Sequence, residues 1–368
     1  MKINKIIILK IFINILFFSI YYLTQFYMSV NKFINNWKIK IQTNRMMQYY
    51  DLCNKGILLN KKKYKLNENP KISIISSVFN NEKYIVRFLR SIQNQFFDDI
   101  EIILIDDYSK DNTVKIIKEC QKKDERIVLI KQKIKRGTLM SRNIGVLKSK
   151  GIYIIIPDSD DILTNNILKL SYNIAKKNKY ELIRFNFYFK NKININSNIF
   201  NRKKNPIYKP ELRTFLFYGY GKLKLHDFNI CNKFIKRELF IKTLNNINKF
   251  YLNKFMVYFE DGLINYALHL NANSLYLLNI IGYFYINNIK SITNKINKNL
   301  EIICFLYYLK FIIENTKNNK YENIMAQYFL KMYLNNQRNK TEFLKYLKVF
   351  MKKMKINPNS QNIFNFYN

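Results

Sequence analysis

The chain has 368 residues, of which 48% are hydrophobic, so it can bury a sizeable core in one large domain or two smaller ones. Its formal net charge is +38 at pH 7. The sequence has no zinc-finger spacing, no RNA-recognition signature and no sustained basic helix, so we do not expect nucleic-acid binding. Lys, Asn, Ile, Tyr and Phe are abundant and Gly is scarce, a bias that an AT-rich coding sequence produces. Attraction to anionic lipid headgroups remains compatible with the charge.

The four cysteines lie far apart, without a CxxC pair. Neither a zinc site nor a disulfide framework is therefore expected.

The N-terminal region predicts a membrane anchor. A short basic segment, residues 1–10, precedes residues 11–31, which contain no charged side chain and are long enough to cross a bilayer as a helix. Lysines flank this run on both sides, so the positive-inside rule does not fix its orientation. Because no small-x-small cleavage site follows, we predict an uncleaved signal-anchor rather than a cleaved signal peptide. A buried core helix is the alternative. The polar residues 32–70 are expected to form a stem or linker.

From residue 71 onward, apolar strand patterns alternate with helical ones. The expected strands cover residues 71–78, 100–105, 126–130 and 152–156, and the expected helices cover 82–94, 111–122 and 137–150. This alternation predicts an α/β fold, with a mostly parallel sheet that carries helices on both faces. Ligands bind such sheets at the carboxyl ends of the strands.

Polar clusters stand at these strand ends. Residues 79–82 follow the first strand, Asp106 and Asp107 end the second, and residues 158–161 follow the fourth. Within the last cluster, Asp158, Asp160 and Asp161 have no basic residue among them, an unfavourable arrangement unless a cation is present. Hard oxygen ligands suit Mg²⁺ or Mn²⁺, and such a metal would bridge to a ligand that carries phosphate. The alternative is a turn and helix N-terminus, where Asp serves as a cap.

Further along, a helix is expected at residues 168–177 and a strand at 182–189. Residues 190–210 are rich in Asn and Lys and predict a mobile loop, and a second block runs from about 211 to 290. Beyond Leu300 the pattern predicts amphipathic helices, with Ile302, Phe305 and Leu309 on one face. Packing against the domain is the expected outcome, with a position on a membrane surface as the alternative.

Ordered motifs from residue 71 to about 293 resemble family 2 glycosyltransferases. The motifs are Phe79-Asn80-Asn81-Glu82, Asn94-Gln95, Asp106-Asp107-Tyr108-Ser109, the segment 136–145, Asp158-Ser159-Asp160-Asp161, the segment 231–239, Glu260-Asp261, and Tyr283-Phe284-Tyr285 with Ser291-Ile292. Three positions depart from the family pattern. Tyr108 replaces a usual Gly, Phe79 replaces a common Tyr, and Lys135-Arg136 stands where many members have Asn.

The resemblance implies a glycosyltransferase A-type, Rossmann-like fold and transfer from a nucleotide-sugar, here expected to be a UDP-sugar, with inversion. On the donor side, Asp107 would accept a hydrogen bond from the base or ribose, and Ser77 and Asn80 would line the base pocket. Arg142 would reach a phosphate.

The same resemblance assigns the acidic residues. A divalent ion, Mn²⁺ or Mg²⁺, would bind Asp160 with support from Asp158 and Asp161, although Asp158 could instead bind the ribose. Asp261 would be the general base for the acceptor hydroxyl, with Glu260 as the neighbouring alternative. The simpler interpretation is that Glu260 and Asp261 only begin a helix.

The predicted catalytic domain covers residues 71–293, with a nucleotide-binding half at 71–165 and an acceptor half at 166–293. A helical region, residues 294–368, follows. A single membrane span favours transfer of one sugar to a glycan or lipid acceptor, and we expect a single-pass protein of the Golgi or endoplasmic reticulum. Two alternatives remain. A nucleotidyltransferase would carry a Gly-rich loop with Arg or Lys after its first strand, where this chain has Ser-Ser-Val-Phe-Asn. A non-catalytic glycosyltransferase-like binding protein is the other.

Overall fold

The computed structural model describes residues 64–189, 192–194, 205–209, 218–219, 222–223, 229–286 and 297–315, together with positions 25, 29, 44, 47–53 and 55. The chain divides into two compact units, Met1–Leu52 and Cys53–Asn368, and the fold below is that of the second. The anchor predicted at residues 11–31 lies outside the described residues, apart from two positions. Among the helices that are described, none combines the length and apolarity that crossing a bilayer requires.

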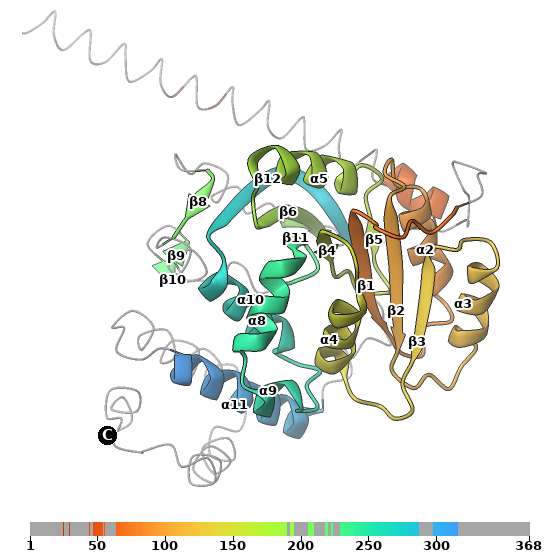
Figure 1. Ribbon diagram of the computed structural model, residues 1–368. Coiled ribbons are helices and arrows are strands. Elements are labelled where there is room, and N and C mark those ends of the chain that lie inside the picture. Colours follow the sequence, from red (N-terminus) through yellow and green to blue (C-terminus); the bar gives the residue numbers. More distant parts are fainter. Residues whose placement is uncertain are drawn as a thin grey trace, which may run out of the picture. The chain divides into compact units, whose positions relative to one another are not determined.

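The first half of the domain is a parallel α/β unit (Figure 1). Its elements are β1 (Ile72–Val78), α2 (Ile85–Gln93), β2 (Ile100–Asp106), α3 (Thr113–Gln121), β3 (Ile127–Lys131), α4 (Thr138–Lys148) and β4 (Tyr153–Ile155). The strands lie in the order β3-β2-β1-β4, and every neighbouring pair is parallel. The predicted alternation of strands and helices is confirmed here.

Side-chain alternation along the strands explains why helices cover both faces of this sheet. Ile74 and Ile102 belong to a buried cluster that includes residues of α2 and of α5 (Ile167–Asn178). Ile75 and Ile103 belong to a second cluster, which is built with α4, α8 (Arg237–Asn246) and α10 (Glu260–Asn271). Successive residues of a strand point to opposite faces. A continuous apolar strand therefore supplies both clusters at once.

The second half makes the sheet mixed. Its larger elements are β5 (Ile162–Leu163), α5 (Ile167–Asn178), β6 (Leu182–Phe189), β11 (Lys233–Lys236), α8 (Arg237–Asn246), α9 (Lys249–Leu252), α10 (Glu260–Asn271) and β12 (Ser274–Tyr285). The order continues β4-β11-β6-β12-β5. β11 is antiparallel to both neighbours, β12 is parallel to β6, and β5 is antiparallel to β12. A mostly parallel sheet is thus correct for the first half and wrong for the second.

Short strands occupy part of the segment that was expected to be a loop. β7 (Lys192–Asn194) pairs with β6, and β8 (Ile207–Tyr208) pairs with β12. β9 (Tyr218–Gly219) and β10 (Lys222–Leu223) form a separate antiparallel pair. The prediction of an unstructured loop over residues 190–210 is therefore wrong at β7 and β8, where hydrogen bonds to long strands supply the order that local sequence does not.

The C-terminal helix α11 (Lys298–Asn315) packs on the domain, near α8, α9 and α10 (Figure 1). Phe305, Leu309 and Ile312 are buried in the same cluster as α10. The predicted packing against the domain is confirmed for this helix, whereas the remainder of the predicted helical region, residues 316–368, lies outside the described residues.

Candidate active site

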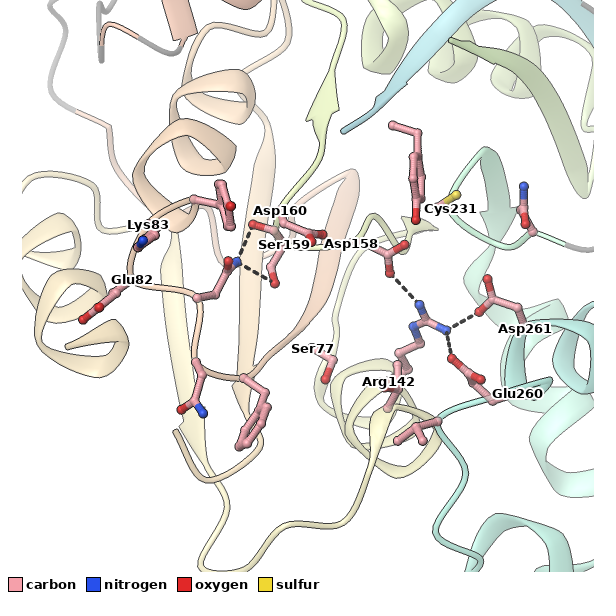
Figure 2. A pocket seen from close by; sticks show the side chains of 18 of the residues that line it. Ser77, Glu82, Lys83, Arg142, Asp158, Ser159, Asp160, Cys231, Glu260 and Asp261 are labelled. Carbon is pink, nitrogen blue, oxygen red and sulfur yellow. Dashed lines mark hydrogen bonds and ion pairs between the residues drawn. The ribbon is translucent and has the colours of Figure 1, made fainter. Parts of the chain in front are cut away.

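A cavity of about 750 Å³ lies where β1 and β4 end and α10 begins. Cavities of this size accommodate small-molecule ligands. Its wall includes most of the predicted site residues, namely Ser77, Asn80, Arg142, Asp158, Asp160, Glu260 and Asp261 (Figure 2). The convergence of strand ends that the sequence predicts is therefore present. Asp107 and Asp161 are not among the described residues that line the cavity.

The loop after β1 is fastened to the loop after β2. The amide of Asn80 donates to Ser109 Oγ at 2.9 Å, and the amide of Lys110 donates to Asn80 Oδ1 at 2.8 Å. The amide of Asn81 donates to Thr113 Oγ1 at 2.7 Å. These bonds fix the floor of the cavity, and they commit the Oδ1 atom of Asn80 to the protein itself.

Two residues of these loops adopt left-handed backbone conformations. Asn80 has φ of 48° and Tyr108 has φ of 73°. Asn adopts left-handed backbone conformations readily, whereas Tyr does so at an energetic cost. This cost explains why family members usually have Gly at the position of Tyr108. Tyr108 thus keeps the turn shape of a Gly, and its exposed ring stacks under Lys110, whose Nζ lies 3.6 Å from the ring centroid.

The acidic segment after β4 is held by partners from distant elements. The Arg87 guanidinium of α2 donates to the carbonyl oxygen of Asp160 at 2.5 Å, and Asn81 Nδ2 donates to that of Ser159 at 2.7 Å. The carboxylates of this segment diverge. Asp158 and Asp160 line the cavity, whereas Asp161 is 1% exposed.

Asp161 does not join Asp158 and Asp160 at the cavity, contrary to the expectation of a metal site with three carboxylates. Its Oδ2 accepts from the Tyr283 hydroxyl at 2.5 Å and its Oδ1 from the Ile286 amide at 2.7 Å. In the part of the chain that the structure describes, no group of three or more His, Cys, Asp or Glu side chains is arranged to hold a metal ion. The Tyr283 hydroxyl and the Ile286 amide therefore engage both oxygens of this third carboxyl group within the protein.

Arg142 of α4 is the centre of the site (Figure 2). Its guanidinium donates to Asp158 Oδ1 at 2.7 Å, to Glu260 Oε1 at 3.3 Å and to Asp261 Oδ1. Burial lowers the pKa of Arg142, but the three carboxylates outweigh it, so the net pKa is raised. Arg142, which was predicted to contact phosphate, thus forms ion pairs with Asp158 after β4 and with Glu260 and Asp261 at the start of α10.

Burial perturbs the acids around Arg142 strongly. It raises the pKa of Asp158 to about 6, against the opposing charge of Arg142. Burial and the neighbouring charge of Asp261 together raise the pKa of Glu260 to about 8. Strongly shifted carboxyl groups in a cavity are typical of functional sites.

Asp107 organises the loop before α4. Its carboxylate accepts from Gln132 Nε2 at 2.9 Å, from the Arg136 amide at 2.7 Å and from the Gly137 amide at 2.9 Å. Gly137 has φ of 86° and begins the turn into α4. The structure therefore gives Asp107 a partner within the protein and does not bring it to the cavity.

The acidic pair begins α10, as the simpler interpretation expected, and it also faces the cavity. Phe259, with φ of 59°, precedes Glu260, and Asp261 Oδ2 accepts from the Ile230 amide at 3.4 Å. Two residues of the site were not predicted from the sequence. Tyr283 is hydrogen-bonded to Asp161 of the acidic segment, and Cys231 lines the cavity. The aromatic motif that contains Tyr283 could have pointed to the first of them.

Comparison with known proteins agrees with these observations. Residues 73–244 match the family model described as Glycosyl transferase family 2. A cholesterol galactosyltransferase of Borreliella burgdorferi is 30% identical over 226 residues, which are 59% of this chain and 60% of that protein. Glycosyltransferase GlyG of Streptococcus pneumoniae is 34% identical over 117 residues, which cover 32% of this chain and 39% of that protein. The chain thus spans less than two thirds of either relative.

Among solved structures, S. aureus TarS 1-349 in complex with UDP-GlcNAc superposes with a TM-score of 0.56 at 18% identity, over 80% of this chain and 79% of TarS 1-349. This likeness shows a shared mixed α/β fold, of the kind that glycosyltransferase A-type enzymes have. The family match over residues 73–244, the relatives named as glycosyltransferases and the shared fold thus agree with one another, and all three are similarities to family 2 glycosyltransferases.

Proposed function

We propose that the protein transfers a sugar from a UDP-sugar to a hydroxyl group of a glycan or lipid acceptor, with inversion at the anomeric carbon. The observation that carries this proposal is the ion-pair network of Arg142, which joins Asp158 at the end of β4 to Glu260 and Asp261 at the start of α10 inside one cavity. The relatives named as glycosyltransferases, and a structural neighbour that was solved with UDP-GlcNAc, support the reaction class.

The donor side would hold the leaving diphosphate. Mg²⁺ and Mn²⁺ commonly take one or two protein carboxylates and complete their coordination with phosphate oxygens and water. Asp158 and Asp160, which both line the cavity, fit such a set, whereas Asp161 does not. When bound, a divalent ion would neutralise the negative charge that develops on the diphosphate. Arg142 offers a second cation at the same place, and a phosphate would compete with Asp158 for its guanidinium.

The acceptor side would supply the general base. Asp261 keeps 20% of its side chain exposed against 11% for Glu260, and it lies across Arg142 from Asp158. Glu260, whose pKa is raised to about 8, would retain its proton at neutral pH and is the weaker candidate. A base opposite the departing diphosphate suits a single displacement, which inverts the anomeric centre.

The cavity wall near these acids is partly apolar. Phe187, Val257 and Tyr285 line it. An acceptor with a hydrophobic portion would bury that portion against these side chains. Because one relative is named a cholesterol galactosyltransferase, sterol and other lipid acceptors belong beside glycans in the trial. Anchorage through residues 11–31 and a Golgi or endoplasmic reticulum location stay predictions.

Calorimetric titration with a panel of nucleotide-sugars and Mn²⁺, followed by mass spectrometry of acceptor products, tests the proposal. We expect a UDP-sugar to bind and its sugar to appear on an acceptor. Binding without transfer to any acceptor would favour the non-catalytic alternative. Formation of a nucleotide-sugar from a sugar phosphate and a nucleoside triphosphate would instead reveal a nucleotidyltransferase.

A further inference from the structure

The hydroxyl of Tyr283 ties the last strand of the sheet to both ends of the acidic segment. It accepts from the Asp158 amide at 3.0 Å and donates to Asp161 Oδ2 at 2.5 Å. The Asp161 amide also donates to the Asp158 carbonyl oxygen at 3.2 Å. One oxygen atom on β12 thus closes the turn that carries Asp158 and Asp160.

The two partners are fully removed from solvent. Tyr283 is 0% exposed and Asp161 is 1% exposed. A buried carboxylate is costly unless its oxygens are hydrogen-bonded, and both oxygens of Asp161 are, to Tyr283 and to the Ile286 amide. Asp158 differs, because its side chain keeps 36% of its surface and lines the cavity. The acids of the segment therefore differ in environment: Asp161 is buried, whereas Asp158 and Asp160 line the cavity.

The neighbouring strands leave this arrangement little freedom. Asp161 directly precedes β5, and β5 pairs with β12 through Leu163 with Tyr283 and Ile162 with Phe284. The next residue of β12, Tyr285, lines the cavity. The Asp161–Tyr283 contact therefore sets the acidic segment against the strand that forms another wall of the same cavity.

We infer that Asp161 and Tyr283 are a positioning pair that holds Asp158 and Asp160 in the geometry needed to bind the donor diphosphate. Neither side chain of the pair touches the donor. This inference rests on the proposed function and adds residues that the donor site depends on through the backbone. A site held by such supporting hydrogen bonds loses affinity when the support is removed, although every direct contact residue remains.

The test measures binding of UDP with Mn²⁺ by calorimetry in wild type, Tyr283→Phe, Asp161→Asn and the double variant. Asp161→Asn loses the hydrogen bond from the Tyr283 hydroxyl, and we expect it to weaken binding about tenfold, the scale of one lost hydrogen bond. Tyr283→Phe loses that bond and the one from the Asp158 amide, and it should weaken binding at least as much. The double variant should bind about as weakly as Tyr283→Phe, because the two residues act as a unit.

Tyr64→Phe is the matched control. Tyr64 is also a buried tyrosine, and its hydroxyl donates to the Gln93 carbonyl oxygen at 2.7 Å, but it is not among the residues that line the cavity. We expect Tyr64→Phe and Tyr283→Phe to lower the unfolding midpoint similarly, while only Tyr283→Phe weakens UDP binding.

The outcomes separate this inference from the proposed function. If wild type binds neither UDP nor any nucleotide-sugar, the proposed function fails, and the inference falls with it before any variant is compared. If wild type binds UDP and Tyr283→Phe binds it equally well, the positioning pair is refuted while the proposed function stands. Loss confined to Asp161→Asn would also refute it, since Asp161 would then contact the ligand directly.

Discussion

At the scale of single residues, the arrangement around Arg142 is the main finding. A guanidinium whose side chain is 7% exposed binds carboxylates from the end of β4 and the start of α10. Removing one partner of a buried ion pair leaves the others without compensation. The structure shows that Arg142 compensates this group of acids, and we propose that it also presents positive charge to a donor.

Arg142→Ala should lower the free energy of unfolding by about 3–5 kcal/mol, because three acids lose their shared cation. Arg142→Lys should lose less stability than Arg142→Ala, since an ammonium keeps the charge but cannot hydrogen-bond several carboxylates with the planar geometry of a guanidinium. Chemical denaturation of both variants measures the difference. Equal stability of wild type and Arg142→Ala would show that these ion pairs contribute nothing to folding.

Asp160→Ala should weaken binding of UDP in the presence of Mn²⁺ by at least about tenfold, because one oxygen ligand beside the diphosphate is lost. Calorimetry with and without the metal is the measurement. Asp98→Ala, at a surface acid away from the cavity wall, is the control and should bind normally. Metal-independent binding of unchanged strength in Asp160→Ala would exclude the metal role of this residue.

The sequence identifies which residues stand at strand ends, but not which way each side chain points. Asp158, Asp160 and Asp161 are close in sequence, yet Tyr283, more than a hundred positions later, binds only the third side chain. Asp107 was likewise expected in the nucleotide site, and the amides of Arg136 and Gly137 take its carboxylate instead. Such choices depend on distant partners, which local patterns do not contain.

At the scale of elements, the loop before α4 fixes where the helix that carries Arg142 begins. The carboxylate of Asp107, directly after β2, accepts hydrogen bonds from the amides of Arg136 and Gly137, and α4 starts at the next residue, Thr138. A carboxylate offers two acceptor oxygens to these amides, whereas an Asn side chain offers one.

Asp107→Asn should therefore release one of the two amides and speed hydrogen exchange at Arg136 or Gly137, with a stability loss of about 1–3 kcal/mol. Exchange measured by mass spectrometry over residues 132–140 is the readout, with the helix α3 as an internal reference. Unaltered exchange in this loop would mean that other contacts fix it.

The fold of the first half follows from its nearly continuous apolar strands, which are buried on both faces, and from the helical segments between them. The second half is not predictable in this way. β11 has four residues and lies antiparallel between β4 and β6, a direction that its own sequence does not encode. β5 and β8 have two residues each and are strands only because β12 offers hydrogen bonds beside them.

The C-terminal helix offers a test of packing. Phe305 is 1% exposed in the cluster shared with α10, whereas Ile303 on the same helix is 39% exposed. Phe305→Ala should lower the free energy of unfolding by about 3–5 kcal/mol, and Ile303→Ala by no more than about 0.5 kcal/mol. Similar losses for the two variants in urea denaturation would contradict the observed packing of α11.

At the scale of the whole molecule, an acidic cavity lies in a chain of formal net charge +38. A net positive charge of this size would attract an anionic donor over distance, while the acids within the cavity need a cation at close range. Arg142 supplies one such cation, and a divalent ion bound with the diphosphate would supply another. A positively charged chain with an acidic cavity suits a nucleotide-sugar better than a neutral ligand.

We propose that one cavity holds a donor half and, across Arg142, a catalytic base. Release of UDP from a UDP-sugar, measured with Mn²⁺ and an acceptor in wild type and in Asp261→Asn, is the decisive measurement. We predict that wild type releases UDP, and that Asp261→Asn still binds UDP within about a factor of three but releases it at least about a hundredfold more slowly, because the acceptor proton has no base. Release by Asp261→Asn at the wild-type rate would show that Asp261 is not the general base.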